Sequence, residues 1–195
     1  MRATIFIFCA FLSVGCGEGD DNDSCDTCLD TSVDPNSNPI WYFNARVYGG
    51  YTVRWPDGNV HVEVSDSRVN QSMLLAIIVE INSLIFPSQL VLVGDGGNIT
   101  IRYDSSRPRN YGYTTWYRSA FQLYKADIDM GNFDDAGYGF HNVLKHELLH
   151  SVGIFCHTSD GGVMDANVPN GTITNAIRNA LIGLYGLPLG TLVYP

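Results

Sequence analysis

The 195-residue chain carries a formal net charge of −9, and only 16% of its residues are charged. A negative chain is repelled by the phosphates of nucleic acids and by anionic membrane surfaces, both of which attract Lys and Arg. The charge therefore argues against a nucleic-acid partner. The length allows a leader and one packed domain, but it is too short for two sizeable cores.

The first 15 residues have the composition of an export signal. Arg2 precedes the apolar run ATIFIFCAFLSV, which is typical of a signal peptide and too short to span a bilayer. The sequence SVGC at 13–16 resembles a bacterial lipobox with Cys16 as the lipid-anchored residue, although Leu12 lies one position earlier than that motif places it. We expect an exported protein, either a cell-surface lipoprotein held to the membrane through Cys16 or a freely secreted one.

Residues 16–39 are rich in Asp, Asn and Ser and have few apolar side chains. Such a segment cannot bury enough surface to fold alone, so we interpret it as an acidic tether or a short pro-segment. Its CDTC sequence pairs Cys25 with Cys28 in the simplest reading, a small disulfide loop. The alternative is latency, in which a thiolate or carboxylate of this segment occupies a catalytic metal until the segment is removed.

From Ile40 onward the pattern is that of a globular domain, 40–195. Alternation, helical spacing and turn residues predict its elements. In chain order these are a hairpin of strands 51–55 and 60–64, a helix over 69–85, strands over 89–94 and 98–103, an irregular loop over 104–119, a strand over 121–130, and helices over about 140–153 and 174–185. Strands that come early and helices that come late predict one α+β domain with a mixed sheet.

The helix expected over 69–85 has apolar residues at helical spacing. Its predicted buried side consists of Met73, Leu74, Ile77, Ile78, Ile81 and Leu84. Pro87 is expected to end the segment, since proline cannot continue a helix.

The sequence HELLH at 146–150 predicts a metal-binding helix. Residues four apart lie on one helix face, so His146 and His150 direct their imidazoles at a common point, as the first two ligands of a tetrahedral Zn²⁺ must. Glu147 lies one step round the helix, where its carboxylate can accept a proton from a water on the metal without binding the metal itself. The HExxH pattern also arises by chance on amphipathic helices, so the residues that follow it matter.

The residues after the helix offer two candidates for a third ligand. Gly153 ends the helix and lets the chain turn back toward the metal. Cys156 stands ten residues after His146, and His157 follows one position later. A thiolate from Cys156 would reduce the Lewis acidity of the metal, whereas His157 would complete a set of three imidazoles.

From HELLHSVG through His157-Thr-Ser-Asp to the turn that contains Met164, the chain resembles the metzincin zinc endopeptidases, and among them the matrixins. Their pattern is HExxHxxGxxH followed by a methionine turn. The closing ITNAIRNALIGLYG at 173–186 is similar to their C-terminal helix. The likeness covers about 120–186 and departs from the family by one extra residue between Gly153 and His157.

This resemblance implies a twisted mixed sheet with an active-site helix and a C-terminal helix. It favours His157 as the third ligand, with Cys156 packed as a small apolar side chain, and it makes Met164 an apolar floor beneath the metal. The segment 125–130 is similar to the edge strand that, in the family, pairs with an extended substrate. The protein would be a monomer that hydrolyses peptide bonds of a protein or peptide substrate, using Zn²⁺ and Glu147 as general base.

The sequence also contains candidate calcium sites and two further histidines. Calcium could bind at the oxygen-rich loops 95–98 and 133–137, although such loops are more often plain turns. His141 and His61 are expected to lie away from the metal.

Two other functions compete with a peptidase. One is a catalytically inactive surface binding module on the same fold, in which the displaced third ligand has abolished hydrolysis. The other is an exported structural lipoprotein in which HExxH is a coincidence.

Overall fold

The computed structural model describes residues 12–15, 34–133, 139–166 and 170–195. Within them, a six-stranded mixed sheet is combined with four α-helices and a short 3-10 helix, which confirms the expected α+β class with a mixed sheet. Strands β2 to β6 all lie within residues 58–130, and β1 comes from the extreme N-terminal part of the chain.

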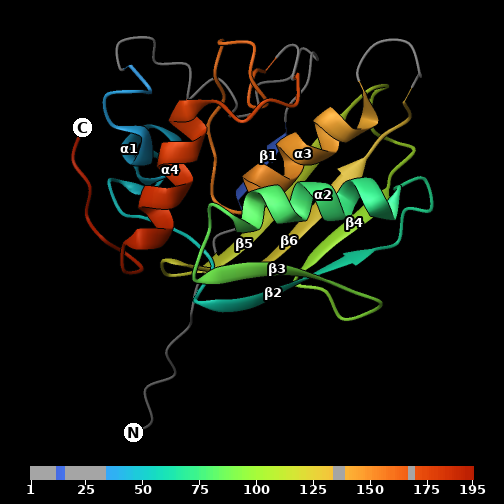
Figure 1. Cartoon of the computed structure of the whole chain (residues 1–195), viewed down its shortest axis with the longest axis horizontal. Coiled ribbons are helices and arrows are strands. Elements are labelled where there is room, and N and C mark those ends of the chain that lie inside the picture. The colour runs from blue at the N-terminus through green and yellow to red at the C-terminus, as the bar shows by residue number, and fades with distance from the viewer. Residues whose placement is uncertain (1–11, 16–33, 134–138, 167–169) are drawn as a thin grey trace, which may run out of the picture.

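The sheet has the strand order β1-β5-β6-β4-β2-β3 (Figure 1). Strands β2, β3, β4 and β6 run parallel to one another, whereas β5 is antiparallel to both β6 and β1. The bounds are β1 Leu12–Gly15, β2 Gly58–Val64, β3 Ser88–Val93, β4 Ile99–Tyr103, β5 Gly112–Ser119 and β6 Gln122–Met130.

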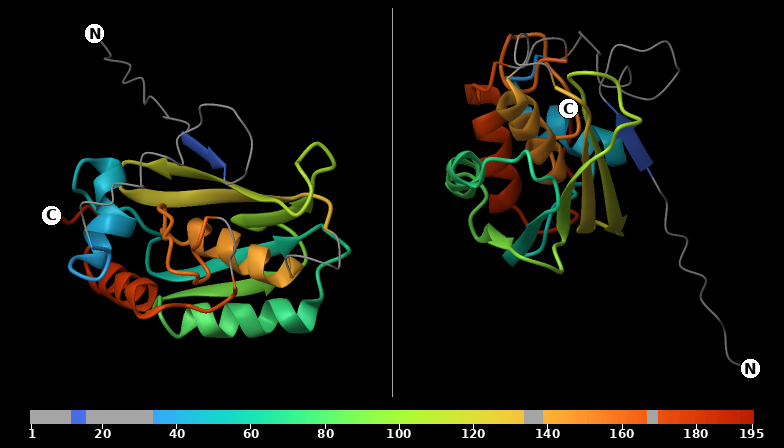
Figure 2. Two further views of the ribbon diagram at one scale, coloured as in Figure 1. Left: turned by 90° about the horizontal axis from the view of Figure 1, so that it is seen from above. Right: turned by 90° about the vertical axis from the view of Figure 1, so that its right-hand side faces the viewer.

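Helices α2, α3 and α4 lie on one side of the sheet (Figure 2). Helix α3 packs against β5 and β6, α2 packs against β3 and α3, and α1 packs against α4. The bounds are α1 Pro39–Phe43, η2 Ala45–Tyr48, α2 Gln71–Asn82, α3 Phe140–Ser151 and α4 Asn175–Gly186. Among the described helices, none has the length and apolar character needed to cross a membrane.

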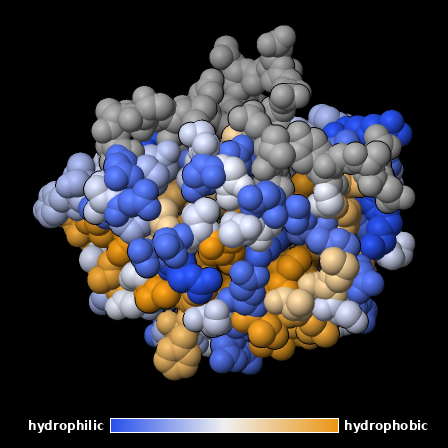
Figure 3. Space-filling view, turned by 45° about the horizontal axis from the view of Figure 1, so that its top comes forward, coloured by the Kyte–Doolittle hydropathy of each residue, from blue (hydrophilic) through white to orange (hydrophobic). Residues whose placement is uncertain are grey.

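Helix α2 confirms the helix expected over 69–85. Asn70 caps it, with its side-chain oxygen accepting from the backbone N–H groups of Ser72 and Met73. The expected buried face is correct apart from Met73, whose side chain is 44% exposed. Met73, Leu75 and Val79 are exposed hydrophobic side chains of this helix. Hydrophobic side chains lie between hydrophilic ones on the surface of the molecule (Figure 3).

The hairpin expected over 51–64 is wrong. Residues 58–64 do form β2, but β2 pairs in parallel with β3 on one side and β4 on the other. Tyr51 and Arg54 form only isolated bridges, to Leu192 and Gln122. Alternation identifies a strand but not its neighbours, and here α2 connects β2 to β3 as a crossover, so that the two strands run parallel.

The loop expected over 104–119 contains a strand that the sequence pattern did not reveal. Residues 112–119 form β5, whose buried positions are Gly112, Thr114 and Trp116. Two of these three inward residues are not hydrophobic, so the alternation that marks a half-buried strand is missing.

The position of β5 also corrects the expected substrate edge. Strand β6, which contains 125–130, pairs with β4 along one side and with β5 along the other. Both rows of its backbone hydrogen-bonding groups are therefore occupied, and no peptide can add to it. Among β2 to β6, strand β5 lies at one edge and β3 at the other, and the outer side of β5 pairs with β1.

Asn44 joins the N-terminal part of the domain to the loop after α3. Its side-chain amide donates to the carbonyls of Val53 and Gly153, each at 2.7 Å, and its oxygen accepts from Val53 N–H at 2.8 Å. Gly153 has φ = 107°, and a Cβ there would meet Leu184, Asn44 and Val53. Gly153 therefore ends the helix as the sequence predicts, because other residues rarely adopt this conformation.

We predict that Asn44→Ala lowers the free energy of unfolding by about 3 kcal/mol. The change leaves buried carbonyl and N–H groups of Val53 and Gly153 without partners, and such groups cost about 1–3 kcal/mol each. Urea denaturation measures the effect. Asn36→Ala, at an exposed position, should change stability by less than about 0.5 kcal/mol; equal losses in the two variants would contradict this role of Asn44.

Candidate metal centre

Helix α3 carries the first two histidines, His146 and His150, one turn apart on its buried face. Their Nε2 atoms lie 3.0 Å apart. The helix passes through the protein interior, since its residues from Val143 to Ser151 are all buried. The face that the HExxH spacing predicts is therefore directed into the core.

The loop after α3 brings His157 to the same point. Its Nε2 lies 3.2 Å from that of His146 and 3.1 Å from that of His150. Backbone contacts fix the loop, because Phe155 N–H donates to Phe43 O at 2.7 Å and the Tyr42 hydroxyl donates to His157 O at 3.2 Å. The extra residue after Gly153 is accommodated without displacing the third imidazole.

These three histidines lie close enough to bind one metal ion. Within the described ranges they are the one group of three or more His, Cys, Asp or Glu residues arranged in this way. The side chains are almost fully buried, between 1% and 3% exposed. The expectation that these three residues come together is thus met by the geometry.

Backbone carbonyls set the tautomers of two of the rings. His146 Nδ1 lies 2.7 Å from Val163 O, and His150 Nδ1 lies 2.5 Å from Ile154 O. A carbonyl only accepts, so each Nδ1 carries the proton and each neutral ring presents a bare Nε2 lone pair. Two lone pairs 3.0 Å apart repel each other, and a shared cation would remove that repulsion.

Burial keeps all three imidazoles neutral. It lowers the pKa of His146 to about 4 and that of His157 to about 3, with the neighbouring His146 adding to the second shift. The pKa of His150 lies well below its usual 6.5 for the same reason, with further lowering by the two other rings. Neutral imidazole is the form that binds a metal.

Cys156 differs from the expectation of a free, packed thiol. It is fully buried, as expected, but it is disulfide-bonded. A disulfide sulfur is not the thiolate that metals bind, so the geometry favours His157 over Cys156 as third ligand. Its bonding partner is not among the described residues, and the expected CDTC loop at 25–28 also lies outside them.

Met164 lies in the tight turn that follows, and its side chain is fully buried. Asp165 N–H donates to Gly162 O at 3.1 Å to close the turn, and Met164 O accepts from Thr158 N–H at 2.8 Å. The adjacent Val163 carbonyl is the group that orients His146. The turn therefore helps to position His146 through Val163. The role of Met164 as an apolar floor beneath the metal stays a prediction.

Glu147 is buried next to the histidines, at 1% exposure. Burial raises its pKa to about 8, while the hydrogen bond from Thr114 and the positive charge of Arg107 oppose the rise. The Thr114 hydroxyl donates to Glu147 Oε2 at 2.6 Å. The carboxyl group of the residue that follows His146 is thus buried and hydrogen-bonded.

Sequence reasoning missed the contribution of β5 to this centre. Thr114 contacts Glu147, and the Trp116 ring stacks on that of His150 with centroids 6.3 Å apart. A Cβ at Gly112 would lie 2.5 Å from Glu147 Cγ, so glycine is needed for β5 to approach α3 this closely. No motif marks these residues, because a strand far from HELLH in sequence supplies them.

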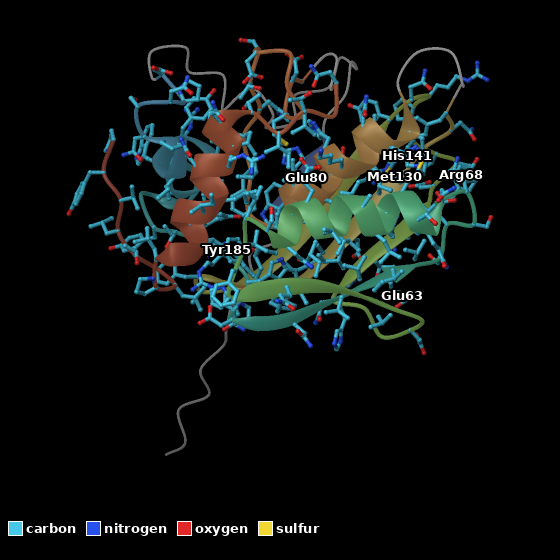
Figure 4. All side chains as sticks on the ribbon, in the orientation of Figure 1. Glu63, Arg68, Glu80, Met130, His141 and Tyr185 are labelled. Atoms are coloured by element: carbon cyan, nitrogen blue, oxygen red, sulfur yellow. The ribbon has the colours of Figure 1, made fainter. Side chains whose placement is uncertain are left out.

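The remaining sequence candidates lie elsewhere. His141 occupies the first turn of α3, half-buried, and does not belong to the cluster (Figure 4). His61 is exposed on β2. In loop 95–98, Asp95 accepts from Gly96 N–H at 2.8 Å, as in a plain turn, and the described residues contain no acidic cluster there. Loop 133–137 lies largely outside the described residues.

Comparison with known proteins adds no relative: no protein family matches the chain, and no curated protein is similar to it.

We predict that the metal-free protein is most stable near pH 6.5. The pKa values of the three histidines are lower in the folded chain than in the unfolded one, so the unfolded state binds more protons and stability falls as pH drops from 6.5 to about 4. Glu147, with a raised pKa, has the opposite sign: its contribution is lost as pH rises from 4.5 to about 8.

The measurement is the Tm of chelator-treated protein between pH 4 and pH 8. His157→Gln should flatten the acid side of the curve, whereas His61→Gln, at an exposed site, should leave it unchanged. A flat curve between pH 4 and pH 6.5 in the unaltered protein would contradict the burial of neutral imidazoles.

We predict that His157→Ala weakens Zn²⁺ binding by at least about 100-fold, because it removes one of three protein ligands. Cys156→Ala should retain one Zn²⁺ per chain, as should His61→Ala. Calorimetry and elemental analysis of dialysed protein measure these values. Loss of zinc in Cys156→Ala, with full binding in His157→Ala, would reverse the assignment of the third ligand.

Proposed function

We propose that the protein is an exported zinc-dependent endopeptidase of the metzincin type, similar to the matrixins. The observation that carries the proposal is the convergence of three buried, neutral imidazoles at one point, with the buried Glu147 directly after the first of them in the chain. Three histidines with one open position are typical of catalytic zinc, whereas structural zinc is usually enclosed by four protein ligands.

The separations of the nitrogens support zinc. Zn–N bonds of about 2.0–2.1 Å in a tetrahedron place the nitrogens about 3.3 Å apart. The three Nε2 atoms lie 3.0, 3.1 and 3.2 Å apart. His146, His150 and His157 would therefore hold the ion with little movement, and the carbonyls of Val163 and Ile154 would keep two of the rings in place.

Bound zinc would supply a Lewis acid that polarises the scissile carbonyl and makes water a nucleophile near neutral pH. Glu147 would accept a proton from the attacking water and deliver it to the leaving amine. Burial raises the pKa of Glu147 above that of an ordinary carboxyl group, and a base with a higher pKa takes up a proton from water more readily. Burial at the site excludes competing solvent from this exchange.

A peptide substrate would lie along the outer side of β5, not along β6. This edge accepts an antiparallel strand, because β1 pairs there with Leu12 opposite Trp116 and Gly15 opposite Tyr113. The neighbouring inward residues Thr114 and Trp116 face Glu147 and His150, so a strand in this position would pass close to the metal ligands. The substrate would thus be held through its backbone.

The N-terminal assignments complete the proposal. Residues 1–15 would direct export, with lipid attachment at Cys16 or free secretion as the outcomes, and 16–39 would form the tether or pro-segment. Because β1 belongs to the proposed leader, its removal would free the edge of β5 for substrate. The protein would act as a monomer on protein or peptide substrates.

A binding module without activity is the alternative. This alternative requires that the third ligand is displaced from the metal site. His157 lies beside His146 and His150, so the structure gives no such displacement. A buried carboxyl group at 147 is also costly to maintain, which is hard to account for in a module that only binds.

The test is cleavage of unfolded casein by the purified, zinc-loaded protein, with and without residues 1–15. We expect hydrolysis that stops on chelation and returns with zinc. Glu147→Gln keeps the shape of the side chain but removes the base, so it should lower kcat by at least about 100-fold while one zinc remains bound.

The controls separate the competing functions. Zinc bound with no hydrolysis by the unaltered protein would favour the binding module. Absence of bound zinc would argue against both the peptidase and the binding module, and it would favour a structural lipoprotein. Glu80→Gln, on α2 and paired with Lys145 at 2.6 Å (Figure 4), changes a carboxylate outside the centre and should leave activity intact.

A further inference from the structure

Thr114 is a polar residue in an apolar setting. Its side chain lies on the inner face of β5, fully buried, between Gly112 and Trp116 on the same face. Valine has the same shape and would pack there without a hydroxyl group that needs a partner. Packing alone therefore does not account for the threonine.

The hydroxyl of Thr114 has two acceptors within reach, and both belong to Glu147. Its Oγ1 lies 2.6 Å from the carboxyl Oε2 and 3.1 Å from the backbone carbonyl. A hydroxyl has one hydrogen to donate, and the shorter contact, to the carboxyl oxygen, is the stronger bond. The hydroxyl thus restrains the orientation of the carboxyl group at the end of the Glu147 side chain.

Gly112 restrains the same group through its other oxygen. A Cβ at this position would lie 2.5 Å from Glu147 Cγ and 2.7 Å from Oε1. The backbone of β5 therefore lies against Oε1, while Thr114, two residues along the same face, binds Oε2. Together they leave the carboxyl group a narrow range of orientations beside the three histidines.

We propose that Thr114 is the positioning residue for Glu147, holding its carboxyl group in the orientation that proton transfer requires. This inference rests on the proposed function, since it assumes that Glu147 acts as the base. A misplacement of about 1 Å in a reacting group can lower a rate by about 100-fold, because proton transfer depends steeply on distance and direction. The hydroxyl acts through Glu147 and has no contact with the metal ligands among its hydrogen bonds.

The experiment compares Thr114→Val with Thr114→Ser in the zinc-loaded protein that lacks residues 1–15, so that the edge of β5 is free of β1. Valine keeps the shape and removes the hydroxyl; serine keeps the hydroxyl. We expect Thr114→Val to lower kcat on casein-derived peptide about 10- to 100-fold with KM within about twofold, and Thr114→Ser to stay within about threefold of the unaltered protein. Thr100→Val, on β4 and outside the proposed substrate edge, should change neither constant.

A second readout does not depend on turnover. Acetohydroxamate binds zinc through its two oxygens and donates a hydrogen bond to a correctly placed carboxylate. Calorimetry should show weaker binding of this probe to Thr114→Val by about 5- to 20-fold, with zinc affinity unchanged. If Thr114→Val does not fold, Thr114→Ala removes the same hydroxyl with less side-chain volume.

The outcomes distinguish the positioning role of Thr114 from the peptidase function itself. Full activity and full probe binding in Thr114→Val would overturn the positioning role and leave the peptidase intact. A rise in KM with unchanged kcat would also overturn it, because it would assign Thr114 to the shape of the substrate edge. Absence of hydrolysis in the unaltered protein would instead overturn the proposed function and, with it, the positioning role that depends on it.

Discussion

Three imidazole Nε2 atoms lie 3.0 to 3.2 Å from one another in a buried site. The rings are neutral, and those of His146 and His150 direct Nε2 lone pairs to the same point. The surrounding fold supplies the restraint: α3 fixes two of the rings, carbonyls of Ile154 and Val163 fix their tautomers, and the loop past Gly153 returns the third. This donor set fits a cation at the centre.

The same burial determines the properties of Glu147. A carboxyl group in a dry environment resists ionisation, which is why its pKa rises to about 8. Strand β5 moderates this effect by donating a hydrogen bond from Thr114, and it approaches closely only because residue 112 is glycine. The strand that borders the proposed substrate position is therefore also the strand that orients the proposed base.

Long-range contacts connect this centre to the rest of the domain. Asn44, near the start of the domain, binds the carbonyl of Gly153 just after α3. The indole N–H of Trp55 donates to Ser151 O at 2.7 Å, and the Tyr185 hydroxyl of α4 donates to Val152 O at 3.0 Å. The carbonyls that an α-helix leaves unpaired at its end are thus bound by three separate segments, which holds the turn toward His157 in one place.

The sequence by itself determined the local features. The spacing of His146, Glu147 and His150 defined a helix face, Gly153 marked its end, and α2, α3, α4, β3, β4 and β6 followed from periodicity, since these signals act over a few residues. Which strand pairs with which was decided only by the tertiary structure. The supposed hairpin partner of β2 lies elsewhere, and β6 is an interior strand, because pairing depends on crossovers and packing between distant segments. The role of β5 was hidden for the same reason: Gly112 and Thr114 gain their meaning from Glu147, more than thirty residues away, and only the folded chain brings them together.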